Sequence, residues 1–200
     1  MPILVQELGE EKVAPFRARR AELERKISPY HAMIGTADKV MLLGQIGVGM
    51  SSLAHRLVFD RFESTYKPTI GVDVYRYQPE DGASPRAPMI VWDSDGNLGD
   101  AMFKHVYLKE ASAAIVIGDI TRSETIEQMV STAAAFRASL PGRVTCFIVN
   151  KIDLTNGADL DLPEALTQEE KMLFYTSALT GENVQQAFAA TSDAIARRTR

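Results

Sequence analysis

Residues 44–52 read GQIGVGMSS, and the segments on either side of them decide the fold. The letters match the phosphate-loop pattern G-x-x-x-x-G-K-[ST] at every position except that of the lysine, where Met50 stands. Such a loop joins a buried strand to a helix. Residues 38–44, DKVMLLG, predict a buried strand, and residues 51–62, SSLAHRLVFDRF, predict a helix. This setting suits a phosphate loop, although a glycine turn can also stand there merely for close packing.

Strands and helices alternate along the remainder of the chain. Further strands are predicted at residues 71–77, 88–93, 112–119, 143–150 and 172–178. Further helices are predicted at residues 103–111, 123–140 and 182–198. This alternation predicts an α/β domain with a mostly parallel sheet of six strands, flanked by about five helices.

A charged segment with a thin apolar stripe precedes the domain. The stripe consists of Val13, Phe16, Leu23 and Ile27. Their spacing places them on one helical face. We therefore expect an N-terminal helical extension with its linker at residues 1–37 and the main domain at residues 38–198. The extension either folds on its own domain or docks into a partner.

The composition argues against several classes of protein. The chain has 200 residues with 22 Lys and Arg against 26 Asp and Glu, which is not the basic surplus of a nucleic-acid binder. No apolar run is long enough for a transmembrane helix, and the first residues become charged too early for a secretory signal. The single cysteine, Cys146, forms neither a disulfide framework nor a zinc site. We expect a cytoplasmic protein, alone or within a complex.

Motifs with polar side chains lie next to four other predicted strands. VWDSDGN at residues 91–97 ends one strand, and YKPTIGVD at residues 66–73 leads into another. NKID at residues 150–153 and YTSALTGEN at residues 175–183 follow the last two strands. Four such elements in this order are not expected by chance, and they favour the phosphate-loop interpretation of residues 44–52.

These motifs resemble the small GTPases of the Ras superfamily, and within them the Rab family. The likeness rests on TIGVD, WD with the following Gly96, YLKEA, DITRSETIE, NKID and TSALTGENV, over about residues 38–198. It implies the P-loop small-GTPase fold, with GTP or GDP and Mg²⁺ as ligands. The chemistry then depends on which of the family's functional residues this chain retains.

The guanine-binding residues are the best preserved. The resemblance assigns base recognition to Asn150, Lys151 and Asp153 and, in a second loop, to Ser177, Ala178 and Leu179. The Asp153 carboxylate would accept two hydrogen bonds from guanine, whereas adenine would place an acceptor there. Asn150 would tie its loop to the phosphate loop, and the Lys151 stem would lie against the base. The Ala178 N–H would meet the guanine oxygen, while Leu179 replaces the family's lysine.

The phosphate-binding residues retain their glycines but not their cation. They are Gly44, Gly47, Val48, Gly49, Met50, Ser51, Ser52 and Gly96. The glycines allow successive N–H groups to face a phosphate, helped by a helix that begins near Met50. Without the lysine ammonium, binding is expected to weaken ~10²-fold or more. For Mg²⁺ the resemblance implies Ser51 and Thr69 as ligands, with Asp93 in the second shell, where it orients the metal's water molecules.

The catalytic position is also altered. Asn97 replaces the glutamine that orients the attacking water in the family, and its side chain is one methylene shorter. Asp95 adds a negative charge close to a bound triphosphate. With Met50 as well, we predict hydrolysis at or below background. The chain is thus interpreted as a pseudo-GTPase with degenerate nucleotide motifs, which binds guanine nucleotide and acts as a protein-interaction module.

An alternative function stays open. The protein can instead be a nucleotide-free structural subunit that uses the domain as a scaffold in a larger complex. A working GTPase rescued by a partner's lysine or arginine is less favoured, because the cation and the glutamine are both replaced. Partners are expected at the N-terminal helix or at the switch face, where Trp92 matches one of three aromatic residues used by Rabs and Val74 replaces another. The ending ATSDAIARRTR lacks a cysteine, so no lipid anchor is expected.

Overall fold

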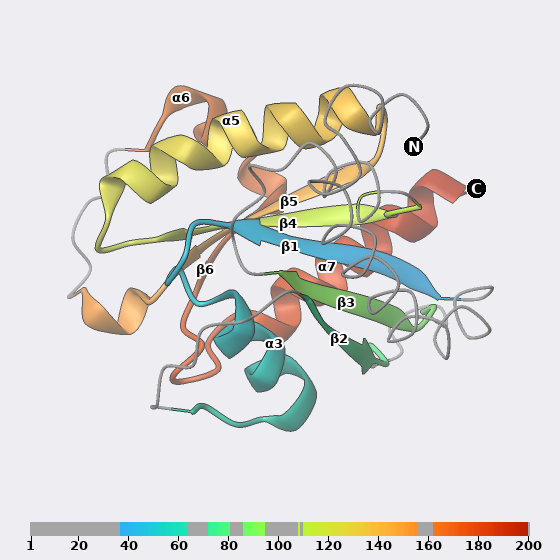
Figure 1. Ribbon diagram of the computed structural model, residues 1–200, viewed down its shortest axis with the longest axis horizontal. Helices are drawn as coiled ribbons and strands as arrows, with labels where there is room; N and C mark the ends of the chain where they lie inside the picture. The colour runs from blue at the N-terminus through green and yellow to red at the C-terminus, as the bar shows by residue number, and fades with distance from the viewer. Residues whose placement is uncertain are drawn as a thin grey trace, which may run out of the picture. The chain divides into compact units, whose positions relative to one another are not determined.

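Six strands form one sheet in the order β2-β3-β1-β4-β5-β6 (Figure 1). The computed structural model describes residues 37–63, 72–80, 86–94, 108, 110–155 and 162–199. The strands are β1 (Asp38–Gly44), β2 (Val72–Tyr77), β3 (Met89–Ser94), β4 (Ala113–Asp119), β5 (Val144–Asn150) and β6 (Leu173–Thr176). Only β2 and β3 pair antiparallel among these strands. The predicted six-stranded, mostly parallel sheet is confirmed.

Helices cover both faces of this sheet. The described α-helices are α3 (Met50–Phe59), α5 (Ser123–Ser139), α6 (Glu164–Thr167) and α7 (Val184–Thr199), with short 3-10 helices η1 (Ile152–Leu154) and η2 (Glu170–Met172). Figure 1 shows α5 over one face and α3 and α7 over the other. The N-terminal extension and almost all of the helix predicted at residues 103–111 lie outside the described residues. None of the described helices is both long and apolar enough to cross a membrane.

The central strand β1 is buried on both faces, as expected for a parallel strand between layers of helices. Val40 and Leu42 belong to one hydrophobic core together with Leu53 of α3 and Phe188 of α7. Each of these four side chains is fully buried. Burial of one such side chain stabilises the fold by about 1.5–3 kcal/mol. This packing holds both ends of residues 44–52, since β1 leads into them and α3 leaves them.

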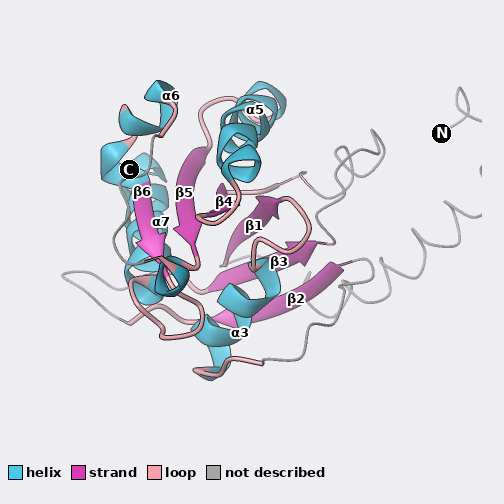
Figure 2. Ribbon diagram, turned by 90° about the vertical axis from the view of Figure 1, so that its left-hand side faces the viewer, coloured by secondary structure: helices cyan, strands magenta, loops and turns pink. Residues whose placement is uncertain are grey.

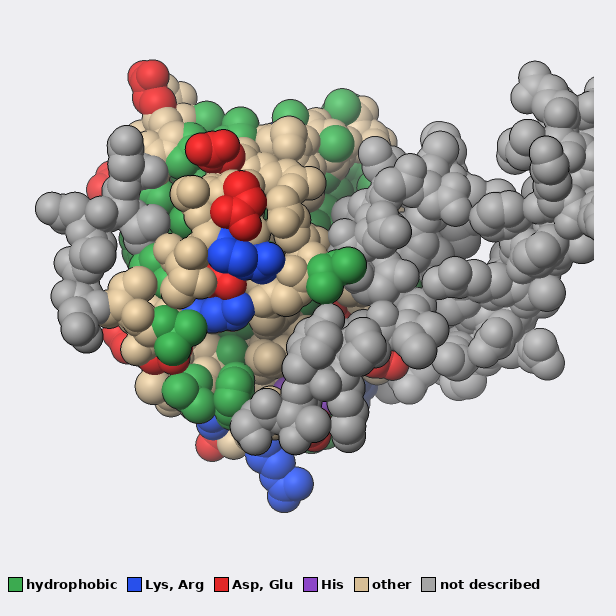
Figure 3. All heavy atoms as spheres, turned by 60° about the vertical axis from the view of Figure 1, so that its left-hand side comes forward, with side chains coloured by type: hydrophobic (Ala, Val, Ile, Leu, Met, Phe, Trp, Pro, Cys, Tyr) green, Lys and Arg blue, Asp and Glu red, His purple; other side chains and the backbone are tan. Residues whose placement is uncertain are grey.

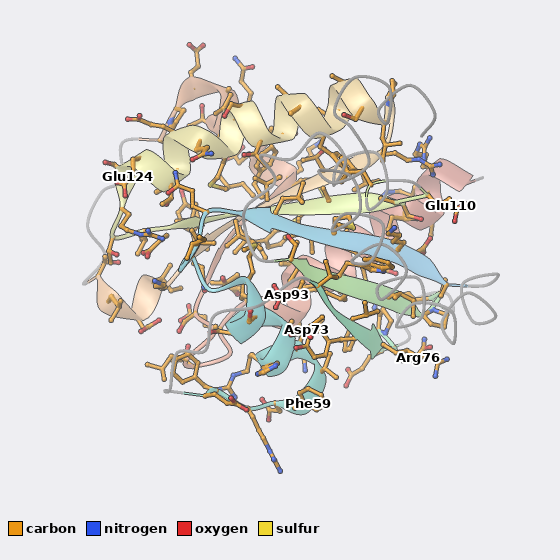
Figure 4. All side chains as sticks on the ribbon, in the orientation of Figure 1. Phe59, Asp73, Arg76, Asp93, Glu110 and Glu124 are labelled. Carbon is orange, nitrogen blue, oxygen red and sulfur yellow. The ribbon has the colours of Figure 1, made fainter. Side chains whose placement is uncertain are left out.

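On the opposite face, α5 approaches β4 closely because residue 118 is a glycine. A Cβ atom at Gly118 would lie 2.5 Å from the Met129 sulfur and 3.2 Å from a side-chain carbon of Ile126. Both of these side chains belong to α5 and are buried. The close approach brings the first turn of α5, marked by Glu124 in Figure 4, to the edge where β1 ends.

Candidate functional site

The carboxyl ends of the parallel strands meet at one edge of the sheet, which faces the viewer in Figure 2. The strand register places Gly44 of β1 beside Ile117 of β4. It also pairs Asp119 of β4 with Asn150 of β5, and Asn150 with Thr176 of β6. Ligands of open α/β sheets bind at such an edge. The phosphate loop (residues 44–52) and the two base loops (residues 150–153 and 177–179) therefore lie around a common site.

Two glycines of the phosphate loop stand where no side chain fits. Gly49 has a φ of 100° and a ψ of 28°, a left-handed conformation, and a Cβ on it would lie 2.4 Å from Asn150 Nδ2. A Cβ on Gly44 would lie 2.6 Å from the Ile117 carbonyl oxygen. Gly49 cannot cap the N-terminus of α3 with a side chain, and the first turn of α3 carries no acidic residue. This helix end fits an anion.

Met50, at the lysine position of the pattern, lies in the core. Its side chain is 6% exposed and belongs to the same hydrophobic cluster as Val48, Leu53 and Ala54. A thioether contributes neither a positive charge nor a strong hydrogen-bond donor. Polar contact with a phosphate therefore falls to main-chain N–H groups and to the hydroxyl groups of Ser51 and Ser52, both half-buried.

Asn150 joins the phosphate loop to both base loops. Its Nδ2 donates to the Val48 carbonyl oxygen at 3.0 Å. Its Oδ1 accepts from Thr176 Oγ1 at 3.1 Å and from the Ala178 N–H at 3.2 Å. The amide is 1% exposed, so these bonds are shielded from water. The Ala178 N–H, expected to meet a guanine oxygen, is thus bonded to Asn150 here.

The two base loops are also joined through Asp153 and Ser177. Ser177 Oγ donates to Asp153 Oδ1 and accepts from the Thr180 N–H at 3.1 Å. Asp153 itself is exposed, so a ligand can reach its carboxylate. Leu179 is 47% exposed and adds an apolar surface in the second base loop. A carboxylate near an apolar surface suits a planar base with N–H donors.

An arginine of α3 holds the second base loop. Arg56 Nε donates to the Ala178 carbonyl oxygen at 2.9 Å, and Arg56 Nη2 donates to that of Leu179 at 2.5 Å. Arg56 also pairs with Asp60, the residue directly after α3, at 3.0 Å. The helix α3, which starts at the phosphate loop, therefore also positions the second base loop.

A cluster formed by Asp119, Arg122 and Lys151 lies against the phosphate loop. Asp119 Oδ2 accepts from Lys151 Nζ at 2.6 Å and from Arg122 Nε at 3.2 Å. Lys151 Nζ also donates to the Gly47 carbonyl oxygen at 2.7 Å, and Arg122 Nη2 donates to that of Ile46 at 3.1 Å. Figure 3 shows basic side chains next to acidic ones near the middle of this face.

The Asp119 carboxylate stays charged in this cluster. Burial by itself would raise the pKa of Asp119, but the hydrogen bonds from Lys151 and Thr121 and the Lys151 charge lower it below its usual value. The sequence motif DITRS contains Asp119, Thr121 and Arg122, three residues to which the family resemblance assigns no role in the site. Asp119 is the last residue of a buried strand and Asp93 lies near the end of another, and this position at the carboxyl end of a strand indicates a functional role.

The proposed metal-binding residues are described only in part. Asp93 is fully buried near the end of β3, directly opposite Asp73 of β2 (Figure 4). Burial, followed by the charges of Asp73, Asp93 and Glu63, raises the pKa of Tyr75 to about 12. Hydroxyl and carboxylate oxygens suit Mg²⁺, so Ser51 and Asp93 fit their assigned roles. Within the described ranges, no group of three or more His, Cys, Asp or Glu forms a metal site.

Some predicted site residues lie outside the described part of the chain. They are Thr69, Asp95, Gly96 and Asn97. Trp92, which the resemblance places on the partner-binding surface, is described and is only 2% exposed. Lys39 Nζ lies 4.0 Å from the centre of its ring. Trp92 is therefore not an exposed anchor for a partner, and Val74 is half-buried.

Comparison with known proteins assigns this chain to a family. The model of the Ras family matches residues 39–197. The chain belongs to the Ras family. Within the Ras family it is a Rab-like small GTPase by descent, as its relatives indicate.

Three relatives illustrate the likeness. "GTP-binding protein ypt5" of Schizosaccharomyces pombe is 32% identical over 76% of this chain and 75% of its own. "Ras-related protein RABA6b" of Arabidopsis thaliana is 34% identical over 75% of this chain and 67% of its own. "Ras-related protein Rab-4B" of Homo sapiens is 32% identical over 75% of this chain and 72% of its own. Ras-family membership implies guanine nucleotide and Mg²⁺ as the ligands of the family in general.

Proposed function

We propose that this Rab-like protein binds GTP or GDP with weakened affinity, has lost or strongly impaired GTP hydrolysis, and acts as a protein-interaction module. The carrying observation is that Asn150 joins the phosphate loop to both base loops, while the lysine position is filled by the buried Met50. The proposal thus combines a preserved base site with a phosphate site that has lost its cation.

The base loops supply the specificity for guanine. In the proposed complex, the exposed carboxylate of Asp153 accepts the ring N–H and the exocyclic amine of guanine. Ser177 holds that carboxylate through a hydrogen bond to Oδ1. Adenine would place an acceptor opposite the carboxylate and leave it without a donor. The protein is therefore expected to prefer guanine over adenine nucleotides.

The phosphate loop is expected to bind phosphate more weakly than a loop with a lysine at position 50. A charge-assisted hydrogen bond contributes about 1.5–3 kcal/mol, so the absence of the lysine contacts weakens binding ~10²-fold. The main chain around Gly47 and Gly49 and the α3 N-terminus remain as anion-binding groups. Ser51 and Thr69 would hold Mg²⁺, with Asp93 orienting its water molecules. When bound, Mg²⁺ would neutralise part of the phosphate charge.

Hydrolysis is expected at or below background. Phosphoryl transfer depends on cations at the β- and γ-phosphate oxygens and on an oriented water molecule. Met50 removes one cation, and Asn97 is too short to orient water as a glutamine does. A misplacement of about 1 Å costs on the order of 10²-fold in rate. GTP, once bound, would therefore persist.

One observation favours the second candidate function, a nucleotide-free structural subunit. The phosphate loop is held by side chains of the chain itself, since Asn150, Lys151 and Arg122 all donate to its carbonyl groups. A loop held in this way can keep its shape by protein contacts alone.

In either function the protein would be cytoplasmic and meet its partner through the N-terminal extension or the switch face.

Nucleotide content and turnover test these functions. The purified protein is denatured, and the released nucleotides are separated by ion-exchange chromatography; the protein is also titrated with GDP and GTP in millimolar Mg²⁺. Guanine nucleotide binding without measurable GTP turnover is the expected result. A site that stays empty at millimolar nucleotide would leave only the structural-subunit function. Hydrolysis at the rate of ordinary small GTPases would refute the proposed impairment.

A further inference from the structure

Three successive carbonyl groups of the phosphate loop accept hydrogen bonds from side chains of other elements. The Ile46 oxygen accepts from Arg122 Nη2 at 3.1 Å, at the start of α5. The Gly47 oxygen accepts from Lys151 Nζ at 2.7 Å. The Val48 oxygen accepts from Asn150 Nδ2 at 3.0 Å. Lys151 and Asn150 belong to the base motif, whereas Arg122 lies outside that motif, at the N-terminus of α5.

These contacts determine where the loop N–H groups point. In a trans peptide the C=O and the following N–H point in opposite directions. A carbonyl group of Ile46 that is held by Arg122 therefore turns the Gly47 N–H away from the guanidinium. The Val48 N–H, which follows the carbonyl held by Lys151, donates to the Gln45 oxygen at 3.3 Å. The side-chain donors thus keep the loop curled.

Arg122 also changes the charge beside the loop. Asp119, whose side chain is 2% exposed, pairs with Lys151 at 2.6 Å and with Arg122 at 3.2 Å. One carboxylate cancels one of the two positive charges, so the cluster keeps a net charge of about +1. Without Arg122, the Lys151–Asp119 pair would be neutral. This remaining charge lies next to a loop whose own lysine position carries Met50.

An ordinary exposed ion pair would contribute only about 0–1 kcal/mol to the stability of the fold. Arg122 differs from that case because its guanidinium bonds a buried carboxylate and a main-chain carbonyl group at once. It also lies close to the loop: a Cβ on Gly47 would be 3.7 Å from Arg122 Nη2. The planar guanidinium has the forked donors that such a double contact requires.

We propose that Arg122 is a positioning residue of the phosphate loop, which fixes the peptide between Ile46 and Gly47 and supplies the net positive charge that Met50 does not. This inference rests on the proposed binding of guanine nucleotide. Arg122 then acts on the phosphate part of the ligand through the loop and leaves the base part unaffected.

Arg122→Ala tests this role without removing the start of α5. The helix start uses the main chain of residue 122, because Thr125 donates to its carbonyl oxygen from both N and Oγ1. Calorimetric titration with GDP and Mg²⁺ is expected to show ~10-fold weaker binding, since a bond from a charged donor is lost. Titration with guanosine, which has no phosphate, is expected to change less than about 2-fold.

Two further variants and a control complete the test. Arg122→Lys keeps the charge without the fork and is expected to recover part of the GDP affinity, whereas Arg122→Gln loses the charge and recovers less. Arg76→Ala on β2 is the matched control, because Arg76 is exposed and lies far from Glu124 and the start of α5 (Figure 4). It should leave both affinities unchanged.

The outcomes separate this inference from the proposed function. Equal losses for GDP and guanosine, or an unchanged GDP affinity in Arg122→Ala, would overturn the role of Arg122. If the wild-type protein binds no GDP, the proposed function fails, and hydrogen exchange of the amides of residues 45–51 decides about Arg122 alone. Faster exchange in Arg122→Ala than in Arg76→Ala supports the positioning role, and equal exchange contradicts it.

Discussion

In the proposed function, the two base loops contact the ligand through side chains, whereas the phosphate loop contacts it mainly through its main chain. Asp153 in the base loops is exposed and held by Ser177. In the phosphate loop, the side chain at the lysine position, Met50, is buried in the core. Both regions lie at the same edge of the sheet and are joined by Asn150. They differ in chemistry while sharing one scaffold.

The contacts that hold the phosphate loop in shape do not include the side chain at its lysine position. The shape of the phosphate loop depends on contacts from Arg122, Asn150 and Lys151, and none of these contacts involves the side chain of residue 50. Burial of the Met50 side chain in the core contributes about 1.5–3 kcal/mol to the stability of the fold. In the proposed function, the phosphate loop would therefore keep its curl without a lysine at this position.

The largest effect is expected where the two regions are joined. Asn150→Ala leaves the Val48 oxygen, the Thr176 hydroxyl and the Ala178 N–H without their partner. A buried polar group left without a partner costs about 1–3 kcal/mol, so the free energy of unfolding should fall by at least about 3 kcal/mol. Urea unfolding followed by circular dichroism measures this change.

Thr176→Val is the matched control for this prediction. It preserves the shape of the side chain and removes only one of the three hydrogen bonds. A loss of about 1 kcal/mol is expected. Equal losses for Asn150→Ala and Thr176→Val would mean that Asn150 does not connect the two regions energetically.

The sheet could be predicted from the sequence because its evidence is local. The run DKVMLLG is apolar without interruption, and β1 is buried on both faces as that pattern indicates. The motif NKID follows the next-to-last strand, and the parallel register then places Asn150 beside Asp119. Strand ends and their order therefore predict which loops meet. The helix and extension outside the described residues remain predictions.

Side-chain contacts between distant segments could not be predicted in the same way. Arg122 and Ile46 are 76 positions apart, and nothing in either local pattern shows that a guanidinium reaches that carbonyl group. The direction of Met50 depends on the packing of α3 against the core. Likewise, Trp92 is 2% exposed, and Lys39 on the neighbouring strand lies over its ring. Such contacts depend on the tertiary packing of rotamers, which no periodicity records.

On the base side of the comparison, Asp153→Asn removes the carboxylate that is proposed to read guanine. An amide would place its NH₂ group or a neutral oxygen opposite the two guanine donors, so affinity for GDP should fall ~10²-fold or more. Calorimetric titration with GDP measures it. The control Glu127→Gln makes the corresponding exchange of a carboxylate for an amide at an exposed side chain of α5. Equal losses in both variants would exclude a specific role of Asp153.

On the phosphate side, Met50→Lys restores a cation to the loop. Binding of GDP should tighten ~10- to 10²-fold, while binding of guanosine should change little, because only the phosphates gain a partner. Without nucleotide the variant should be less stable than wild type, since a charged side chain replaces a buried apolar one. Met50→Leu is the control, because it keeps the apolar burial without a charge. A Lys variant with no preference for GDP over guanosine would refute the account of the lost cation.

The smallest expected effect concerns acid sensitivity of the cluster beside the phosphate loop. The ordinary pKa of an aspartate is 3.8, and folding lowers the pKa of Asp119 below this value. Burial opposes this shift, whereas the hydrogen bonds from Lys151 and Thr121 cause it. A carboxyl with a lowered folded pKa stabilises the fold above its unfolded pKa, and this contribution disappears as the pH falls through the folded pKa. The difference in unfolding free energy between wild type and Asp119→Asn should therefore be about 1 kcal/mol near neutral pH and shrink below pH 3.8.

Asp193 serves as a control, because its carboxylate is also held by an arginine but does not contact the phosphate loop. The pKa of Asp193 is also lowered, because Arg86 donates two hydrogen bonds to it at 2.8 and 3.0 Å. Asp193→Asn should thus lose stability over the same range of pH, yet keep the protection of the amides of residues 45–51 against hydrogen exchange near neutral pH. Asp119→Asn should lose that protection. Equal protection in the two variants would mean that Asp119 does not hold the phosphate loop through Lys151 and Arg122.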